Sequence, residues 1–299
     1  MHRQAYLLLV LTTLFWGGNP IAGKLAVGHI SPMLLTAARW GIAAAILAWL
    51  GRRRLAADWP TIRARLPLLV CLGFFGFTVF NVALYSALKY TSAINVSIEQ
   101  AGIPMLIFIG NFLLFRLHAS LAQITGFLVS LVGVALTASH GDPARLLALD
   151  LNFGDALMLG AVIAYAGYTM ALRFKPNVHW LSLMIALTAG AFITSLPFTA
   201  VEVAAGSAIL PDARGWGVIF YTTIFPSIVA QIFYVRGVEL IGANRAGLFV
   251  NLVPVFGTLL SVVVLGEAFY AYHAVALVLV LGGIWLAETG GRKVAASGV

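Results

Sequence analysis

Hydrophobic residues form ten long runs along the chain, and short polar links separate them. About 20 consecutive apolar residues are what a helix needs to cross the hydrocarbon core of a bilayer. The links are built on Pro, Gly, Ser or Asn, as in "HISP", "FKPN" and "LIGAN". The pattern therefore predicts an all-α integral membrane protein with ten transmembrane helices, at residues 5–25, 33–50, 66–89, 92–115, 119–138, 153–172, 180–203, 214–236, 244–265 and 270–289.

The composition agrees with a membrane location. Of 299 residues, 61% are hydrophobic and 9% are charged, whereas a soluble domain carries about 25% charged residues. So much apolar surface has to face lipid. The one cysteine, Cys71, excludes an intrachain disulfide. The first apolar run is long enough to span and is not closed by a small-residue cleavage site, so we expect it to stay as the first helix.

The basic residues predict the orientation of the chain. Thirteen of the 18 lysines and arginines lie on the side of the N-terminus, four lie on the other side, and Arg39 falls within a span. Cytoplasmic loops carry the excess of Lys and Arg, so both termini are expected in the cytoplasm. This rule also explains the net charge of +8, and we expect no nucleic-acid partner.

The two halves of the chain share a pattern. Shifting the sequence by 150 residues places Pro104 on Pro254 and Gly133 on Gly283 without a gap, although residue identity between the halves is no better than chance. Because each half has five spans, an odd number, the second half would enter the membrane upside down. Inverted repeats are a hallmark of secondary transporters, whose substrate sits near the midplane where helices are broken. The expected domains are residues 1–140 for the first five-helix repeat, 150–290 for the second and 291–299 for a short cytoplasmic tail.

Several motifs resemble a known family. "WGGNPIAGK" in the first span, Arg39 in the second and "LGEAFYAYHAVALVLVLGGIWL" near the end are similar to the drug/metabolite transporter superfamily in its ten-helix, two-repeat form, and within it to bacterial exporters of amino acids and related metabolites. The resemblance covers essentially the whole chain. It implies a central cavity between the halves, alternating access and a bacterial inner (plasma) membrane. One departure is that Glu267, the acidic residue after the proline-containing helix, has Leu117 as its counterpart in the first half.

Three polar residues are expected at one depth. Asn19, Arg39 and Glu99 each lie six or seven residues from the outer end of a span, which is roughly 9–10 Å below the outer boundary at about 1.5 Å per residue. A lone charge there is expensive. Arg39 and Glu99 could therefore form a buried ion pair that fixes packing, or one or both could face the cavity and meet the substrate.

The stretch "SIEQAGIP" places a carboxylate beside a proline. A bend at Pro104 would free the carbonyl of Gln100, and that group needs water or substrate because lipid cannot satisfy it. Asn251 and Pro254 would form the equivalent in the inverted half. Pro20 gives either an ordinary kink or freed backbone groups beside the cavity.

These observations define the candidate substrate-binding residues. They comprise the polar residues within spans and the aromatic residues at mid-depth, which suit a zwitterion that carries an apolar side chain. The set is Trp16, Asn19, Arg39, Asn81, Tyr85, Asn95, Glu99, Gln100, Tyr165, Tyr168, Gln231, Tyr234, Arg245 and Asn251, with helix breaks at Pro20, Pro104 and Pro254.

Other function classes fit less well. The six histidines lie at ends or links without ligand spacing, and no nucleophile motif is present, so we expect neither an enzyme nor a metal nor a cofactor. The leading interpretation is export of neutral or aromatic amino acids and related metabolites by a monomer whose partners are a small-molecule substrate and membrane lipid. Two alternatives stay open: efflux of organic cations or multiple drugs, and transport of sugar phosphates or nucleotide sugars. Because Glu99, the one deep acid, could be tied to Arg39, we expect facilitated export rather than proton coupling.

Overall fold

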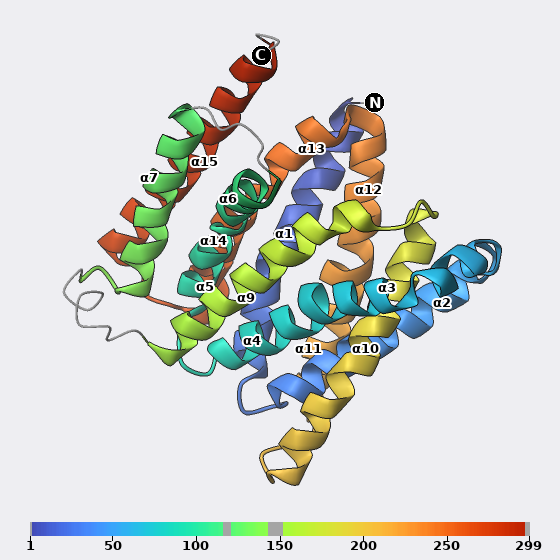
Figure 1. Ribbon diagram of the computed structural model, residues 1–299. Helices are drawn as coiled ribbons and strands as arrows, with labels where there is room; N and C mark the ends of the chain where they lie inside the picture. Colours follow the sequence, from blue (N-terminus) through green and yellow to red (C-terminus); the bar gives the residue numbers. More distant parts are fainter. Residues whose placement is uncertain (1, 116–120, 143–151, 297–299) are drawn as a thin grey trace.

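The computed structural model describes residues 2–115, 121–142 and 152–296, and these residues form helices joined by turns (Figure 1). The helices of the first half are α1 (His2–Ala26), α2 (Pro32–Ala64), α3 (Leu66–Gly73), η1 (Phe74–Val79), α4 (Phe80–Ala87), α5 (Ala93–Gln100), α6 (Ile103–Phe115) and α7 (Leu121–Ala138). Those of the second half are α9 (Phe153–Ala171), η2 (Leu172–Phe174), α10 (Trp180–Ala204), α11 (Ala213–Ile224), η3 (Phe225–Val229), α12 (Ala230–Ile241), α13 (Ala243–Val250), α14 (Val253–Leu265) and α15 (Ala271–Ala296).

Eight helical segments are long and apolar enough to cross a membrane, and they coincide with the first eight predicted spans. The last two predicted spans correspond to shorter apolar helices, Val253–Leu265 and Ala271–Ala287. Large apolar side chains point away from the protein, such as Leu113, Val263 and Val278, which are 66%, 71% and 72% exposed. Such surfaces require lipid, so the chain is a multi-pass membrane protein. The count of ten spans stays a prediction.

The polar break predicted near Pro104 is present and is sharper than a bend. The helix ends at Gln100, a turn follows at Ala101–Gly102, and Pro104 is the second residue of α6. Proline fits there because the first turn of a helix needs no N–H donor. The second half repeats this arrangement, with a turn between α13 and α14 and Pro254 as the second residue of α14.

Two π-helical turns, which the sequence analysis did not predict, also recur at this spacing. η1 interrupts the segment formed by α3 and α4, and η3 interrupts the segment formed by α11 and α12. Their residues, 74–79 and 225–229, differ by about 150 positions. Such π turns are rare and frequently lie at functional sites.

Helices at equivalent places in the two halves pack against one another. α7 lies along α15, and α2 lies along α10 (Figure 1). Small residues permit this proximity: a Cβ added at Gly126 would lie 2.4 Å from the carbonyl oxygen of Gly283. A Cβ at Gly133 would lie 2.8 Å from the carbonyl oxygen of Ala276, so the two glycines matched in the sequence, Gly133 and Gly283, occupy the same seam. Close approach of small residues is the usual basis of helix association in lipid.

Candidate functional site

Arg39 is the centre of a buried polar cluster. Its side chain is 5% exposed. Nη1 donates to Asn19 Oδ1 at 2.9 Å, to Asn81 Oδ1 at 2.8 Å and to the Tyr85 hydroxyl, and Nε donates to Ser227 Oγ at 2.7 Å. These partners come from α1, α4 and η3, so the guanidinium joins three segments to α2. All of them are neutral, and the arginine charge therefore meets no carboxylate among these contacts.

The π turn in η3 places Ser227 at this cluster. Ser227 Oγ donates to the carbonyl of Thr222, five residues earlier, at 2.8 Å, which is the spacing of a π turn rather than an α-helix. Pro226 contributes no N–H to the turn, and its carbonyl accepts a hydrogen bond of 3.1 Å from Trp16 Nε1. In this turn the backbone carbonyl of Pro226 is therefore paired with Trp16, a predicted site residue, and the Ser227 hydroxyl faces Arg39.

Aromatic side chains gather beside this cluster. The ring centroids of Trp16 and Tyr234 are 5.4 Å apart, those of Tyr165 and Tyr168 are 5.3 Å apart, and those of Phe80 and Tyr165 are 4.8 Å apart. These rings come from α1, α12, α9 and α4. Four of the five predicted aromatic residues thus form two pairs, Trp16 with Tyr234 and Tyr165 with Tyr168, and the fifth, Tyr85, belongs to the Arg39 cluster itself.

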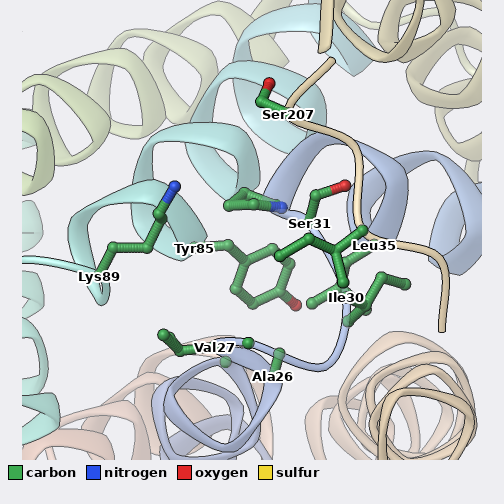
Figure 2. A pocket seen from close by; sticks show the side chains of 12 residues that line it. Ala26, Val27, Ile30, Ser31, Leu35, Tyr85, Lys89 and Ser207 are labelled. Carbon is green, nitrogen blue, oxygen red and sulfur yellow. The ribbon is translucent and has the colours of Figure 1, made fainter. Parts of the chain in front are cut away.

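A hollow leads from one end of the protein toward the cluster. It has an empty volume of about 360 Å³, which includes open solvent, and it is lined by residues of the turn between α1 and α2, by Lys89 and by Ser207 and Ile209 (Figure 2). Tyr85 is one of the lining residues, labelled near the middle of the close view, and its hydroxyl contacts both Arg39 and Asn19. Tyr85 therefore separates the hollow from the buried arginine.

Glu99 does not pair with Arg39, so the expected ion pair is wrong. The Glu99 side chain is 0% exposed, and within the described part of the chain neither carboxylate oxygen has a hydrogen-bond partner. Equal depth placed Asn19 correctly beside Arg39, but depth does not determine the direction in which a side chain points. The reason for expecting facilitated export, a Glu99 tied to Arg39, is therefore absent.

The remaining predicted residues lie apart from Arg39. Asn95 Nδ2 donates to Thr91 Oγ1 at 3.3 Å, and Asn95 Oδ1 contacts His273 Nε2 at 3.2 Å. Gln100 Nε2 donates to the carbonyl of Val96 in its own helix at 3.3 Å. In the second half, Gln231 and Asn251 are half-buried on α12 and between α13 and α14, and Arg245 is exposed on α13.

At the end of the protein where the hollow opens, carboxylates of the second half accept hydrogen bonds from residues of the first half. Glu267 accepts hydrogen bonds from the backbone N–H groups of Ala93 and Ile94 at 2.8 and 3.0 Å, which caps α5. Its sequence counterpart, Leu117, lies outside the described residues. Three further contacts join the halves: Glu202 with Ser31 at 2.6 Å, Asp212 with His29 at 2.6 Å, and Asp155 with Thr91. The hydrogen bond with His29 holds the pKa of Asp212 below its usual value.

Sequence reasoning missed Ser227, Asp155, His140 and His273. His140 Nε2 lies 2.8 Å from Asp155 Oδ2. Asp155 stands in the first turn of α9. An acidic residue at this position normally complements the helix dipole, so nothing in the sequence suggested hydrogen bonds to other side chains. A π turn has no sequence signal that distinguishes "TIFPSIV" from an ordinary apolar helix.

This arrangement defines a class of protein: a multi-pass helical membrane protein whose buried polar cluster is joined across two similar halves. The model of the EamA-like transporter family matches residues 3–139 and again residues 152–289. The chain belongs to the EamA-like transporter family.

Similar proteins cover nearly the whole chain. "Uncharacterized transporter YetK" of Bacillus subtilis is 27% identical over 94% of this chain and 86% of its own length. "Uncharacterized inner membrane transporter YicL" of Salmonella typhimurium is 24% identical over 97% of each chain. A solved crystal structure superposes with a TM-score of 0.64 at 21% identity, over 98% of this chain and 99% of that one, which supports the fold.

Proposed function

We propose that this transporter exports small solutes, principally neutral or aromatic amino acids and related metabolites, across a bacterial inner membrane by alternating access. The observation that carries the proposal is Arg39, a buried cation that donates hydrogen bonds to four neutral oxygens, those of Asn19, Asn81, Tyr85 and Ser227. A carboxylate is the natural ligand of a guanidinium, because two parallel hydrogen bonds and the charge both favour it.

The surroundings of Arg39 supply the other parts of an amino-acid site. Trp16, Tyr165, Tyr168 and Tyr234 offer ring faces to an apolar or aromatic side chain. Asn19 Oδ1 and the Tyr85 oxygen are acceptors that an ammonium group could share with Arg39. A zwitterion would then exchange the neutral contacts of Arg39 for its own carboxylate.

The two alternatives have less support. A site for organic cations needs an acid within an aromatic cage, but the Glu99 carboxylate is buried and has no hydrogen-bond partner, the arginine cluster included, in the part of the chain that the structure describes. A site for sugar phosphates needs several cations. Lys24 Nζ instead donates to the backbone carbonyls of Leu88 and Thr91 at 2.8 and 2.6 Å, and Arg245 is exposed on α13.

The architecture proposed for this function is ten transmembrane helices in two inverted repeats. It is supported by the recurrence of helix breaks and π turns about 150 residues apart and by the packing of α2 on α10 and of α7 on α15. A two-fold axis in the membrane plane brings such counterparts together. Arg39 with its partners would serve the outer half of the pathway, and Gln231, Arg245 and Asn251 the inner half.

Uptake into proteoliposomes tests the proposal. Radiolabelled phenylalanine, tetraphenylphosphonium and glucose 6-phosphate serve as probes of the three substrate classes. We expect uptake of phenylalanine, and Arg39→Gln should lower it by about 10-fold or more, since a hydrogen bond to a charged group contributes about 1.5–3 kcal/mol. The control is Arg236→Gln, because Arg236 is 55% exposed and bonds Glu239 at the surface.

Two results would contradict the proposal. One is phenylalanine uptake no faster than in protein-free liposomes while another probe is transported. The other is full phenylalanine uptake by an Arg39→Gln variant whose folded yield matches that of wild type. If this variant does not fold, Tyr85→Phe removes one contact of the same guanidinium and should slow uptake.

A further inference from the structure

Glu99 is a buried acid without a structural task among the described residues. Both carboxylate oxygens are buried and lack a hydrogen-bond partner. An ionised carboxylate in that position would lose its hydration without compensation, which is among the most expensive arrangements in a protein interior. Burial without partners favours the uncharged carboxyl group, which carries a proton.

The direction of Glu99 separates it from the arginine cluster. Ser97, two residues earlier and thus about 200° around the helix, lies against α14, where a Cβ at Gly257 would be 2.4 Å from Ser97 Oγ. Glu99 shares the opposite face of α5 with Asn95, one turn earlier. The turn at Ala101–Gly102 follows directly, and a Cβ at Gly102 would lie 3.3 Å from Val134 of α7 and 4.0 Å from Val162 of α9. The face of α5 that carries Glu99 is therefore turned away from α14, and it adjoins the seam between the end of α5, α7 and α9.

A chain of polar side chains connects this seam to the end of the protein that carries the hollow. His140 is 29% exposed, and its Nε2 lies 2.8 Å from Oδ2 of Asp155, whose side chain is 0% exposed. The other oxygen of Asp155 accepts a hydrogen bond from Thr91, which in turn accepts one from Asn95. Asn95 precedes Glu99 by one turn of α5, so the chain of hydrogen bonds ends on the turn that carries Glu99.

The charged groups on the surrounding elements are few. α5 packs against α1, α7, α9, α14 and α15. α7 and α14 carry no titratable side chain. Asp155 of α9, His140 after α7 and His273 of α15 belong to the polar chain, and Lys24 of α1 is bonded to backbone carbonyls. Of these side chains, His140 is the partly exposed acid–base group, and Asp155 lies between it and the residues that lead to Glu99.

We propose that Glu99 is a proton-binding site that couples solute export to proton entry, with His140 and Asp155 as the path from the outer side. The inference rests on the proposed function as an exporter. In this path protonated His140 passes a proton from Nε2 to Asp155, the proton continues past Thr91 and Asn95 to the Glu99 carboxylate one turn further along α5, and outer water reprotonates the imidazole. Thr91 and Asn95 orient Asp155. The proton leaves Glu99 toward the cytoplasm when the access state changes, so one proton enters for a solute that leaves.

Infrared difference titration of the purified protein in lipid nanodiscs tests proton binding without a substrate. Wild type should show a protonated-carboxyl band that disappears at high pH. Glu99→Gln should lack this band, whereas the surface control Glu239→Gln should retain it. His140→Asn keeps a side chain that tolerates the left-handed backbone at this residue, where φ is 54°. It should retain the band but slow its return after a drop in pH by about tenfold or more.

Proteoliposomes with an acidic lumen test the coupling. One proton exchanged for each solute supports an accumulation of phenylalanine of up to about tenfold per pH unit, and Glu99→Gln should abolish the dependence of transport on the pH gradient. A carboxyl band that persists in Glu99→Gln would overturn the proposal, as would a His140→Asn variant with unaltered protonation rate. If wild type transports none of the probes, the proposed function fails, but the infrared titration still decides whether Glu99 binds the proton.

Discussion

Replacing Glu267 tests how the two halves are held together. Its two oxygens accept hydrogen bonds from the N–H groups of Ala93 and Ile94 at 2.8 and 3.0 Å, and both of these residues are 0% exposed. In Glu267→Ala two buried donors lose their partner, and each such loss costs about 1–3 kcal/mol. The negative charge at the start of α5 adds about 0.3–1 kcal/mol through the helix dipole. We expect a total destabilisation of about 2–7 kcal/mol.

Thermal unfolding in one detergent, followed by size-exclusion chromatography, measures this effect. The expected fall in apparent Tm is at least about 4 °C, because 1 kcal/mol lowers the Tm of a chain of this size by about 2 °C or more. Glu267→Gln keeps one acceptor oxygen and should lose about half as much. Glu239→Ala is the control, because Glu239 is 51% exposed and bonds Arg236 at the surface. An unchanged Tm in Glu267→Ala, or an equal fall in the control, would refute the assignment of Glu267 as the cap of α5.

Three further changes test other contacts. Ser227→Ala removes the acceptor of Arg39 Nε at 2.7 Å and should slow phenylalanine uptake by about tenfold; uptake at the wild-type rate would show that the π turn does not position Arg39. Gly126→Ala places a Cβ 2.4 Å from a backbone oxygen and should reduce folded yield, whereas Gly160→Ala, with nothing within 4 Å, should not; equal yields would contradict the close packing of α7 on α15. In a background without the exposed Cys71, cysteines at Asp142 and Arg54 should react with a membrane-impermeant reagent from opposite faces, and reaction of both from one face would contradict the predicted topology.

Local chemistry made several features predictable. Proline at positions 104 and 254 stands in the first turn of α6 and of α14, where its missing N–H is tolerated. The break predicted at Pro20 is wrong, because α1 continues through this residue from His2 to Ala26. Depth along a span placed Asn19 and Arg39 together correctly, because helices crossing one bilayer share its boundaries.

Rotation of a helix about its axis was not predictable. Glu99 has the same predicted depth as Arg39 but stands on the face of α5 opposite Ser97, and the packing of Ser97 against Gly257 of α14 fixes this rotation of the helix. The π turn that brings Ser227 to Arg39 depends on tertiary contacts, among them the hydrogen bond from Trp16 to Pro226. Asp155 and His140 stand near the ends of separate helices, and chain folding alone brings them together.

Binding of phenylalanine and of its decarboxylated analogue phenethylamine tests the central claim most directly. The two ligands share the ring and the amine, so their difference reports the contact between a carboxylate and Arg39. Titration calorimetry with the purified protein should give a dissociation constant for phenylalanine at least about tenfold lower than that for phenethylamine. Arg39→Gln should remove this difference. Equal affinity of wild type for the two ligands, or tighter binding of the amine, would contradict a carboxylate site at Arg39.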